Sequence, residues 1–202
     1  MMLKFRIISC VYFIFCFSIT KGQSKLSQYE MRWALRYPIN ALKIKIHLNE
    51  AMEVYESVKA SNVLGCFENG GKLDAFRHCY TMAFLSKYVS VPKLRALGKA
   101  HEKGNEANFY KKHLEFGERA DSLSCEMDLR NNELGFLIGN NYQKATKDEL
   151  KQYVIEQIKA GKAWYLRRNQ NNEYVSCKND IIRLEEYKNK WFIPKCLVKS
   201  NE

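Results

Sequence analysis

The chain has 202 residues, a formal net charge of +11 from 33 Lys and Arg against 22 Asp and Glu, and 46% hydrophobic residues. This length and composition suit one domain with a substantial core. Because the positive charges are spread along the chain in blocks of no more than two, and no nucleic-acid-binding motif accompanies them, we expect a solvated surface that prefers anionic envelope components to nucleic acid.

Residues 1–22 are typical of a secretory signal peptide. Lys4 and Arg6 form a positively charged start, and an apolar run over 7–20 leads to small residues suited to cleavage before Gln23. The alternative is an uncleaved anchor, but a bilayer span takes roughly 18 or more apolar residues. We therefore expect an exported protein, periplasmic or secreted, whose mature chain has no segment long enough to cross a membrane.

Residues 23–161 are predicted to form a helical domain. Two capping boxes of the form S/T-x-x-E, at 27–30 and 146–149, each open a helix, and Pro38 is placed to begin another. Gly161 is suited to end the last of them. Apolar periodicity and turn residues predict the remaining helices over 41–58, 73–86, 92–103 and 125–142, with a polar and irregular stretch over 104–120.

Residues 162–202 differ in character and are predicted to form a β appendage packed on the same domain. Two short strands, over 163–168 and 174–177, flank an Asn-rich turn, which favours a hairpin. A further helix is expected over 180–189, and a final strand or anchor over 191–193. The predicted fold class is therefore mainly α: a single compact helical domain with a small C-terminal β-hairpin.

The cysteines outside the predicted signal peptide are Cys66, Cys79, Cys125, Cys177 and Cys196. Export permits disulfides, and an odd number of cysteines leaves at least one thiol free. Cys79 is the best candidate for a buried thiol because it lies in an apolar helix. Cys177 and Cys196 flank the C-terminal segment and can pair, although sequence alone leaves the connectivity open. No C-x-x-C pair occurs, which argues against a zinc ribbon or a thioredoxin-like site.

The predicted helix over 73–86 is apolar on almost every side, yet it carries Asp74, Arg77 and His78 within five positions. Such a helix is normally buried, and burying these polar groups is costly unless each finds a partner. Asp74 and His78 are four residues apart and face the same way, which suits a metal site or an acid–base pair. The alternative is a structural Asp74–Arg77 salt bridge beside an ordinary hydrogen-bonded core histidine.

A second pair of polar residues, His101 and Glu102, lies near the predicted end of a helix, where the helix dipole favours a histidine. The pair is similar to the start of the zinc-protease pattern H-E-x-x-H. Asn105 occupies the place of the second histidine, which excludes that motif.

The third polar segment, over 127–135, continues into a glycine-containing helix face. Asp128, Asn132, Gly135 and Gly139 fall within a narrow arc of this face. Polar side chains followed by glycines leave a groove that a ligand can enter, or against which another helix can pack. The sequence leaves both interpretations open.

These three segments lie on consecutive predicted helices, which usually pack together, so their polar side chains can converge. Histidine and carboxylate ligands with one open position commonly hold a metal that activates water, and without a metal the same groups could act as general acid and base. We expect a divalent metal such as zinc, held by His78, His101 and Asp128. The candidate site comprises catalytic Asp74, His78, His101, Glu102 and Asp128, and substrate-binding Arg77, Asn131 and Asn132.

Together the three segments resemble a bacterial family of unknown function. Its members contain the motifs D-A-F-R-H-A, A-H-E and M-D-x-x-N-N-x-x-G, which stand here at 74–79, 100–102 and 127–135, with Cys79 in place of the usual alanine. The resemblance covers about residues 33–139. It implies export or cell-wall association and, in some members, a place at the tail of large toxin-like proteins. It supplies no reaction, so the motif positions are carried over as a site without assigned catalytic roles.

Two functions therefore compete at the level of sequence. The first is a metal-assisted hydrolase acting outside the cytoplasm on a phosphoester, a lipid or a cell-wall component. The second is a non-enzymatic binding or interaction module whose buried polar cluster is structural. A toxin acting directly on membranes is the least favoured, because the chain lacks a long amphipathic or spanning segment.

Overall fold

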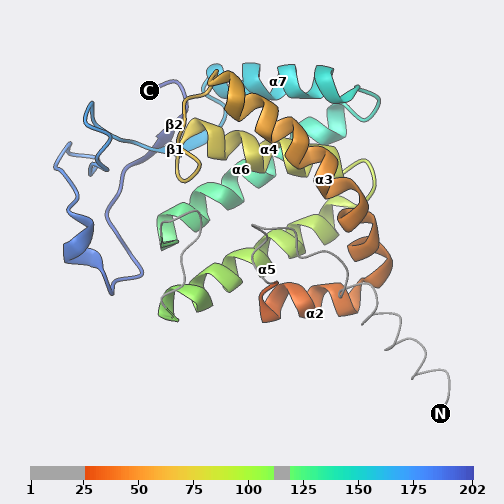
Figure 1. Ribbon diagram of the computed structural model, residues 1–202, viewed down its shortest axis with the longest axis horizontal. Coiled ribbons are helices and arrows are strands. Elements are labelled where there is room, and N and C mark those ends of the chain that lie inside the picture. The colour runs from red at the N-terminus through yellow and green to blue at the C-terminus, as the bar shows by residue number, and fades with distance from the viewer. Residues whose placement is uncertain (1–25, 112–118) are drawn as a thin grey trace, which may run out of the picture.

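The computed structural model describes residues 26–111 and 119–202, and the predicted mainly α fold is confirmed (Figure 1). The predicted signal peptide, residues 1–22, lies outside the described residues. The helices are α2 (Gln28–Arg36), α3 (Pro38–Ser61), α4 (Lys72–Leu85), α5 (Val91–Tyr110), α6 (Ser122–Asn141) and α7 (Lys147–Lys159). None of these helices is both long and apolar enough to span a lipid bilayer.

Side-chain caps determine where three of the helices begin. The two predicted capping boxes are confirmed: the hydroxyls of Ser27 and Thr146 each accept a hydrogen bond from the backbone N–H of the glutamate three residues later, and that glutamate accepts one from the N–H of the cap. Asp121 and Ser124 form the same arrangement at the start of α6, which the sequence analysis did not identify. Pro38 begins α3, as predicted.

The central helix of the fold is α4, which packs against α3, α6 and α7 (Figure 1). Its apolar back is buried, and the rings of Phe76 and Tyr80 stack with centroids 5.3 Å apart. On α6, Gly135 and Gly139 lie against the backbone of α4, and a Cβ added at Gly135 would stand 2.5 Å from the carbonyl oxygen of Cys79. The structure therefore uses these glycines for close helix packing.

The helix α5 is longer than predicted, because it continues through Gly104 to Tyr110. The prediction of an irregular stretch is wrong over 104–110. A Cβ added at Gly104 would stand 2.6 Å from the Cβ of Ser27, at the start of α2. The glycine thus permits two helices to approach closely and does not end one.

The C-terminal sheet joins two distant strands, β1 (Trp164–Leu166) and β2 (Leu197–Lys199), in antiparallel register. The prediction that residues 174–177 form a strand paired with β1 is wrong. Just after β1, this stretch forms only an isolated β-bridge, between Arg168 and Tyr174. The end of the chain folds back to lie beside β1, and the backbone N–H of Arg167 donates a hydrogen bond to the carbonyl of Cys196, just before β2.

The rest of the C-terminal segment is less regular than predicted. A single 3-10 turn, Leu184–Tyr187, replaces the helix expected over 180–189, and 191–193 contains no strand. A disulfide joins Cys177 to Cys196, the pairing that the sequence allowed, and Cys79 is a buried free thiol, as predicted. The segment packs onto α6 through an apolar cluster of Met127, Leu166, Tyr174, Ile182 and Ile193.

Candidate metal centre

The loop before α4 fixes the position of Asp74. Gly70 has φ +68°, a conformation that glycine adopts without steric cost, and its N–H donates to Oδ2 of Asp74 at 2.7 Å. Its carbonyl accepts a hydrogen bond from the N–H of Leu166 in β1 at 2.7 Å. One turn further along α4, Arg77 Nη2 lies 2.6 Å from Oδ1 of Asp74. The buried Asp74 is thus held by backbone and side chain, and the predicted Asp74–Arg77 salt bridge is present.

The imidazole of His78 meets α6 with both of its nitrogens. Nδ1 lies 3.2 Å from the amide oxygen of Asn132. Because an amide oxygen can only accept, a neutral imidazole that makes this contact carries its proton on Nδ1 and has a lone pair on Nε2. Nε2 lies 3.2 Å from Oδ1 of Asp128 and 3.6 Å from Oδ1 of Asp74, and it forms no hydrogen bond within the described part of the chain. A lone pair therefore faces two carboxylates.

Burial and neighbouring charge keep this imidazole neutral. Burial lowers the pKa of His78 well below its ordinary value, and the positive charges of Arg77 and His101 lower it further. The hydrogen bond to Asn132 raises that pKa but does not restore it. The neutral imidazole is the form that binds a metal ion.

Three side chains can therefore offer one ligand atom each to a common cation. Oxygens of Asp74 and Asp128 and a nitrogen of His78 all lie within 4.8 Å of one another, and within residues 26–111 and 119–202 no other group of histidine, cysteine and carboxylate ligands does so. The three side chains are only 4%, 10% and 7% exposed, respectively. Metal–ligand bonds of roughly 2.0–2.2 Å to nitrogen and oxygen fit such spacings, and the donor set suits a divalent cation.

A narrow pocket opens beside this group. Its interior has about 20 Å³ of room for a water-sized molecule, which is enough for one water. Asp74 and Asp128 line it together with three cations, Arg77, Arg119 and Lys195. The surrounding lining residues are Asn69, Gly70, Ala120, Ser124 and Tyr174. Carboxylates that can bind a cation and basic side chains that can bind an anion therefore line the same small space.

The C-terminal segment supplies part of this pocket, which the sequence analysis missed. Lys195 is buried, its Nζ lies 2.7 Å from Oδ2 of Asp121 at the start of α6, and it lies 3.8 Å from the ring centroid of Tyr174. The only sequence signal for Lys195 is its place next to Cys196, one of the two cysteines that can pair. No spacing rule connects it to α6.

The A-H-E segment stands apart from the three candidate ligands. Nδ1 of His101 lies 3.0 Å from Oε1 of Glu30 on α2, so this imidazole joins α5 to α2. The buried Glu102 accepts a hydrogen bond from the side-chain amide of Asn105 at 3.1 Å. His101 contributes positive charge near His78, but its nitrogens are not among the clustered ligand atoms.

The two asparagines of the third segment have separate positions. Asn132 orients His78, as described above. Asn131 turns to the other side, where its amide donates to the carbonyl of Trp164 at 3.0 Å and accepts from the N–H of Trp164 at 2.9 Å. The structure therefore brings Asp74, Arg77, His78, Asp128 and Asn132 together, and it places Asn131, His101 and Glu102 outside that group.

One family model matches the chain. The family is described as "Domain of unknown function (DUF6973)", and the match covers residues 31–162. No curated protein and no solved structure is significantly similar to the chain. The match includes all three motif segments and ends just before β1.

Proposed function

The chain belongs to this family of unknown function, and from the geometry of its buried cluster we propose that it is a metal-dependent hydrolase of phosphate esters or similar anionic esters. One observation carries the proposal: the lone pair of His78 Nε2 faces carboxylate oxygens of Asp74 and Asp128 at 3.6 and 3.2 Å. The negative charges of the two carboxylates and the lone pair repel one another; Arg77 compensates part of this charge at Asp74, and a divalent cation between the three atoms would compensate more of it. A divalent metal is the cation that this donor set suits.

In this proposal Asp74, His78 and Asp128 hold a divalent metal such as zinc. A metal so placed supplies a bound water whose pKa is lowered toward neutrality. The chain itself orients the ligands: Asn132 keeps the proton on Nδ1 of His78, and the N–H of Gly70 fixes Asp74. The ligand set differs from the sequence-based expectation, because Asp74 takes the place that His101 was expected to fill.

The cations of the pocket support an anionic substrate. Arg77, Arg119 and Lys195 line the space next to the ligands, where they can bind the oxygens of a phosphate group and stabilise negative charge that develops during hydrolysis. The pocket has room for about one water molecule, so a substrate phosphate would bind at its mouth and not inside it, within reach of the lining cations.

Export is part of the proposal. The signal-like residues 1–22 and the Cys177–Cys196 disulfide support a bacterial protein that works in the periplasm or outside the cell, since disulfides persist in oxidising compartments. The expected substrates are then extracytoplasmic phosphoesters, lipid headgroups included.

The test combines metal binding with hydrolysis. The protein is stripped with a chelator and titrated calorimetrically with Zn²⁺ and Mn²⁺, and hydrolysis of bis-p-nitrophenyl phosphate is followed before and after. We expect about one metal per chain, hydrolysis only with metal, and loss of both in His78→Gln and Asp128→Asn. His101→Gln is the matched control and should keep the metal. A wild type that binds no metal, or a control that loses it equally, would refute the assignment.

The alternative, a non-enzymatic module with a structural polar cluster, also has support in the contacts of Asp74 with Gly70 and Arg77. In that case His78→Gln should lower the free energy of unfolding to the same extent with and without metal. Metal-dependent stabilisation of the wild type that is missing in the variant separates the two functions, because only a bound ligand shifts stability by mass action.

A further inference from the structure

An apolar stripe runs along the outside of α2 and the first half of α3. Its members are large apolar side chains that solvent reaches. They are three or four residues apart within each of two helices that meet at Tyr37, so on each helix they share one side. They are Met31, Leu35, Ile39, Leu42 and Ile46, with Leu35 58% and Ile39 71% exposed. Singly exposed apolar residues are normal, but several on neighbouring turns of two connected helices indicate an interaction surface.

The core does not require this stripe. On α2 the buried side chains are Trp33 and Ala34, and the indole N–H of Trp33 donates to the carbonyl of Lys93 at 2.9 Å. Glu30 turns inward as well, to His101. The helix is thus anchored by one side while Met31 and Leu35 face solvent on another. One apolar side of α2 is thus buried in the fold, and the second apolar side remains exposed to solvent.

The charges around the stripe are almost all positive. Arg32, Arg36, Lys43 and Lys45 are exposed beside it. The only acidic residue between positions 26 and 48 is Glu30, whose carboxylate is paired with His101. Exposed apolar side chains flanked by Lys and Arg are the pattern by which helices lie in the interface of an anionic lipid bilayer.

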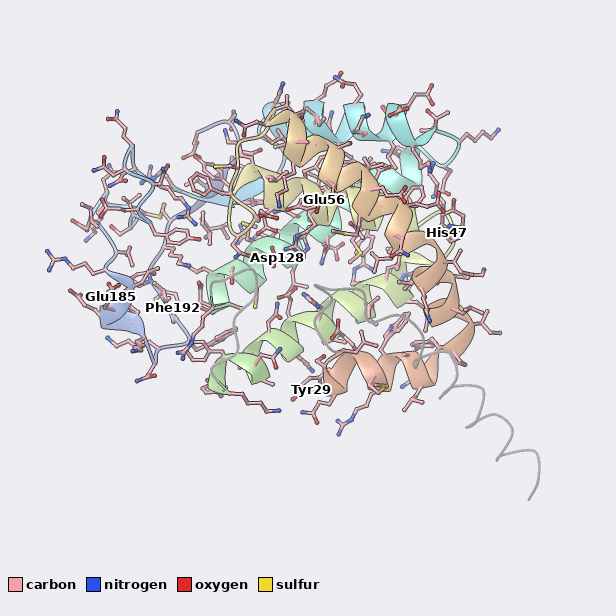
Figure 2. The ribbon with its side chains drawn as sticks, viewed as in Figure 1. Tyr29, His47, Glu56, Asp128, Glu185 and Phe192 are labelled. Atoms are coloured by element: carbon pink, nitrogen blue, oxygen red, sulfur yellow. A yellow bond between two sulfur atoms is a disulfide. The ribbon has the colours of Figure 1, made fainter. Side chains whose placement is uncertain are left out.

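We propose that this α2–α3 face binds the surface of an anionic lipid membrane. The apolar side chains would enter the boundary between headgroups and acyl chains, and the four cations would pair with lipid phosphates. The face lies toward the N-terminal end of the chain, at the opposite end of the long axis from the C-terminal segment (Figure 1). Figure 2 shows the same separation between His47, just past the stripe on α3, and Phe192 in the C-terminal segment. Membrane binding would therefore leave the pocket accessible.

The test uses the chain from Gln23 onward, which keeps every described element. Binding is measured by cosedimentation with vesicles of phosphatidylglycerol and phosphatidylcholine, and with vesicles of phosphatidylcholine alone. We expect binding to the anionic vesicles that weakens at high salt, and little binding to the neutral ones. The double variant Leu35→Gln/Ile39→Gln should reduce the partition coefficient about tenfold or more, because two anchoring side chains are lost.

The matched control is Leu137→Gln/Phe192→Gln. These side chains are 63% and 60% exposed, they lie on α6 and in the C-terminal segment, and neither belongs to the stripe. The control should bind like the wild type, and thermal unfolding of all three proteins checks that they are folded. Equal loss in both double variants, or equal binding to neutral vesicles, would overturn the proposal. The proposal would also be overturned if the protein did not bind vesicles but formed a stable dimer that only Leu35→Gln/Ile39→Gln dissociated. The stripe would then bind a second copy of the chain.

Discussion

His78 is held by residues of two helices, and each contact limits what its imidazole can do. Asn132 fixes which nitrogen carries the proton, and Asp74 and Asp128 receive the other nitrogen. The i, i+4 spacing of Asp74 and His78 was readable from the sequence, because it depends only on helical periodicity. Asp128 was also predicted as a ligand, from the expectation that consecutive helices pack together. The contribution of Lys195 could not be predicted, because it depends on the path of a non-helical segment.

The amide of Asn132 offers a test of ligand orientation. Asn132→Leu removes the acceptor from Nδ1 and leaves the three proposed ligands in place. We expect metal affinity to fall by roughly 10–100-fold, as is usual when a partner that orients a ligand is lost. Calorimetric titration with Zn²⁺ measures this, and Asn140→Leu on the exposed part of α6 serves as the control. Unchanged affinity in Asn132→Leu would remove the orienting role.

Glu30 gives a test of how stability depends on pH. Partial burial raises its pKa, but the hydrogen bond and charge of His101, followed by the hydrogen bonds at Ser27, outweigh this and lower the pKa below 4.5. A carboxyl whose pKa is lower in the folded state stabilises the fold above its ordinary pKa, and loses that contribution as the pH falls through the folded value.

Glu30→Gln should therefore be less stable than the wild type at pH 6, and the difference should shrink by pH 3. Urea unfolding at both values measures it. Glu53→Gln, at an exposed position of α3, is the control for replacing a glutamate on a helix by glutamine. A difference that stays constant with pH would mean that the lost contribution is not electrostatic.

Among the elements, helix starts were predicted well and strand partners poorly. Capping boxes act over three residues, so the starts of α2 and α7 follow from local sequence. Gly104 was misread as a helix end because its role depends on α2, which approaches it from far along the chain. The partner of β1 was misassigned for the same reason: the favoured local hairpin lost to β2, more than thirty positions away.

The contact between α4 and α6 gives a prediction at this scale. In Gly135→Ala the new Cβ meets the carbonyl oxygen of Cys79 at 2.5 Å and the Cβ of Met82 at 3.0 Å. Backbone cannot yield as a side chain can, so overpacking should outweigh the gain in helix propensity. We expect a net loss of about 2 kcal/mol in the free energy of unfolding, measured with urea. Asn140→Ala on the exposed side of α6 should be neutral or slightly stabilising, and equal losses would point to a general effect on the helix.

At the scale of the whole molecule, the C-terminal segment is joined to the helical part by long-range contacts. The Cys177–Cys196 disulfide closes 19 residues of it, and the Lys195–Asp121 pair ties it to the start of α6. Neither contact belongs to the helical periodicity on which the fold was predicted. The segment is also where the predicted and observed structures differ most.

Removing the disulfide should weaken this attachment. Cys177→Ser/Cys196→Ser should lose roughly 3 kcal/mol of stability, from the loop-closure entropy returned to the unfolded chain. Thermal unfolding and limited proteolysis measure the effect, and early cuts should fall within 167–196. The exposed free thiol of Cys66 provides the control, since Cys66→Ser should change neither measurement. A double variant as stable as the wild type would show that the remaining contacts suffice.

The side chain of Asn131 has a broader consequence. Its amide forms hydrogen bonds with both the N–H and the carbonyl of residue 164, just beyond the end of the family match, and both bonds are to the main chain. Hydrogen bonds to the main chain do not depend on which side chain residue 164 carries. A C-terminal segment of different sequence could therefore follow these helices and still attach at the same place, provided that its backbone is extended there.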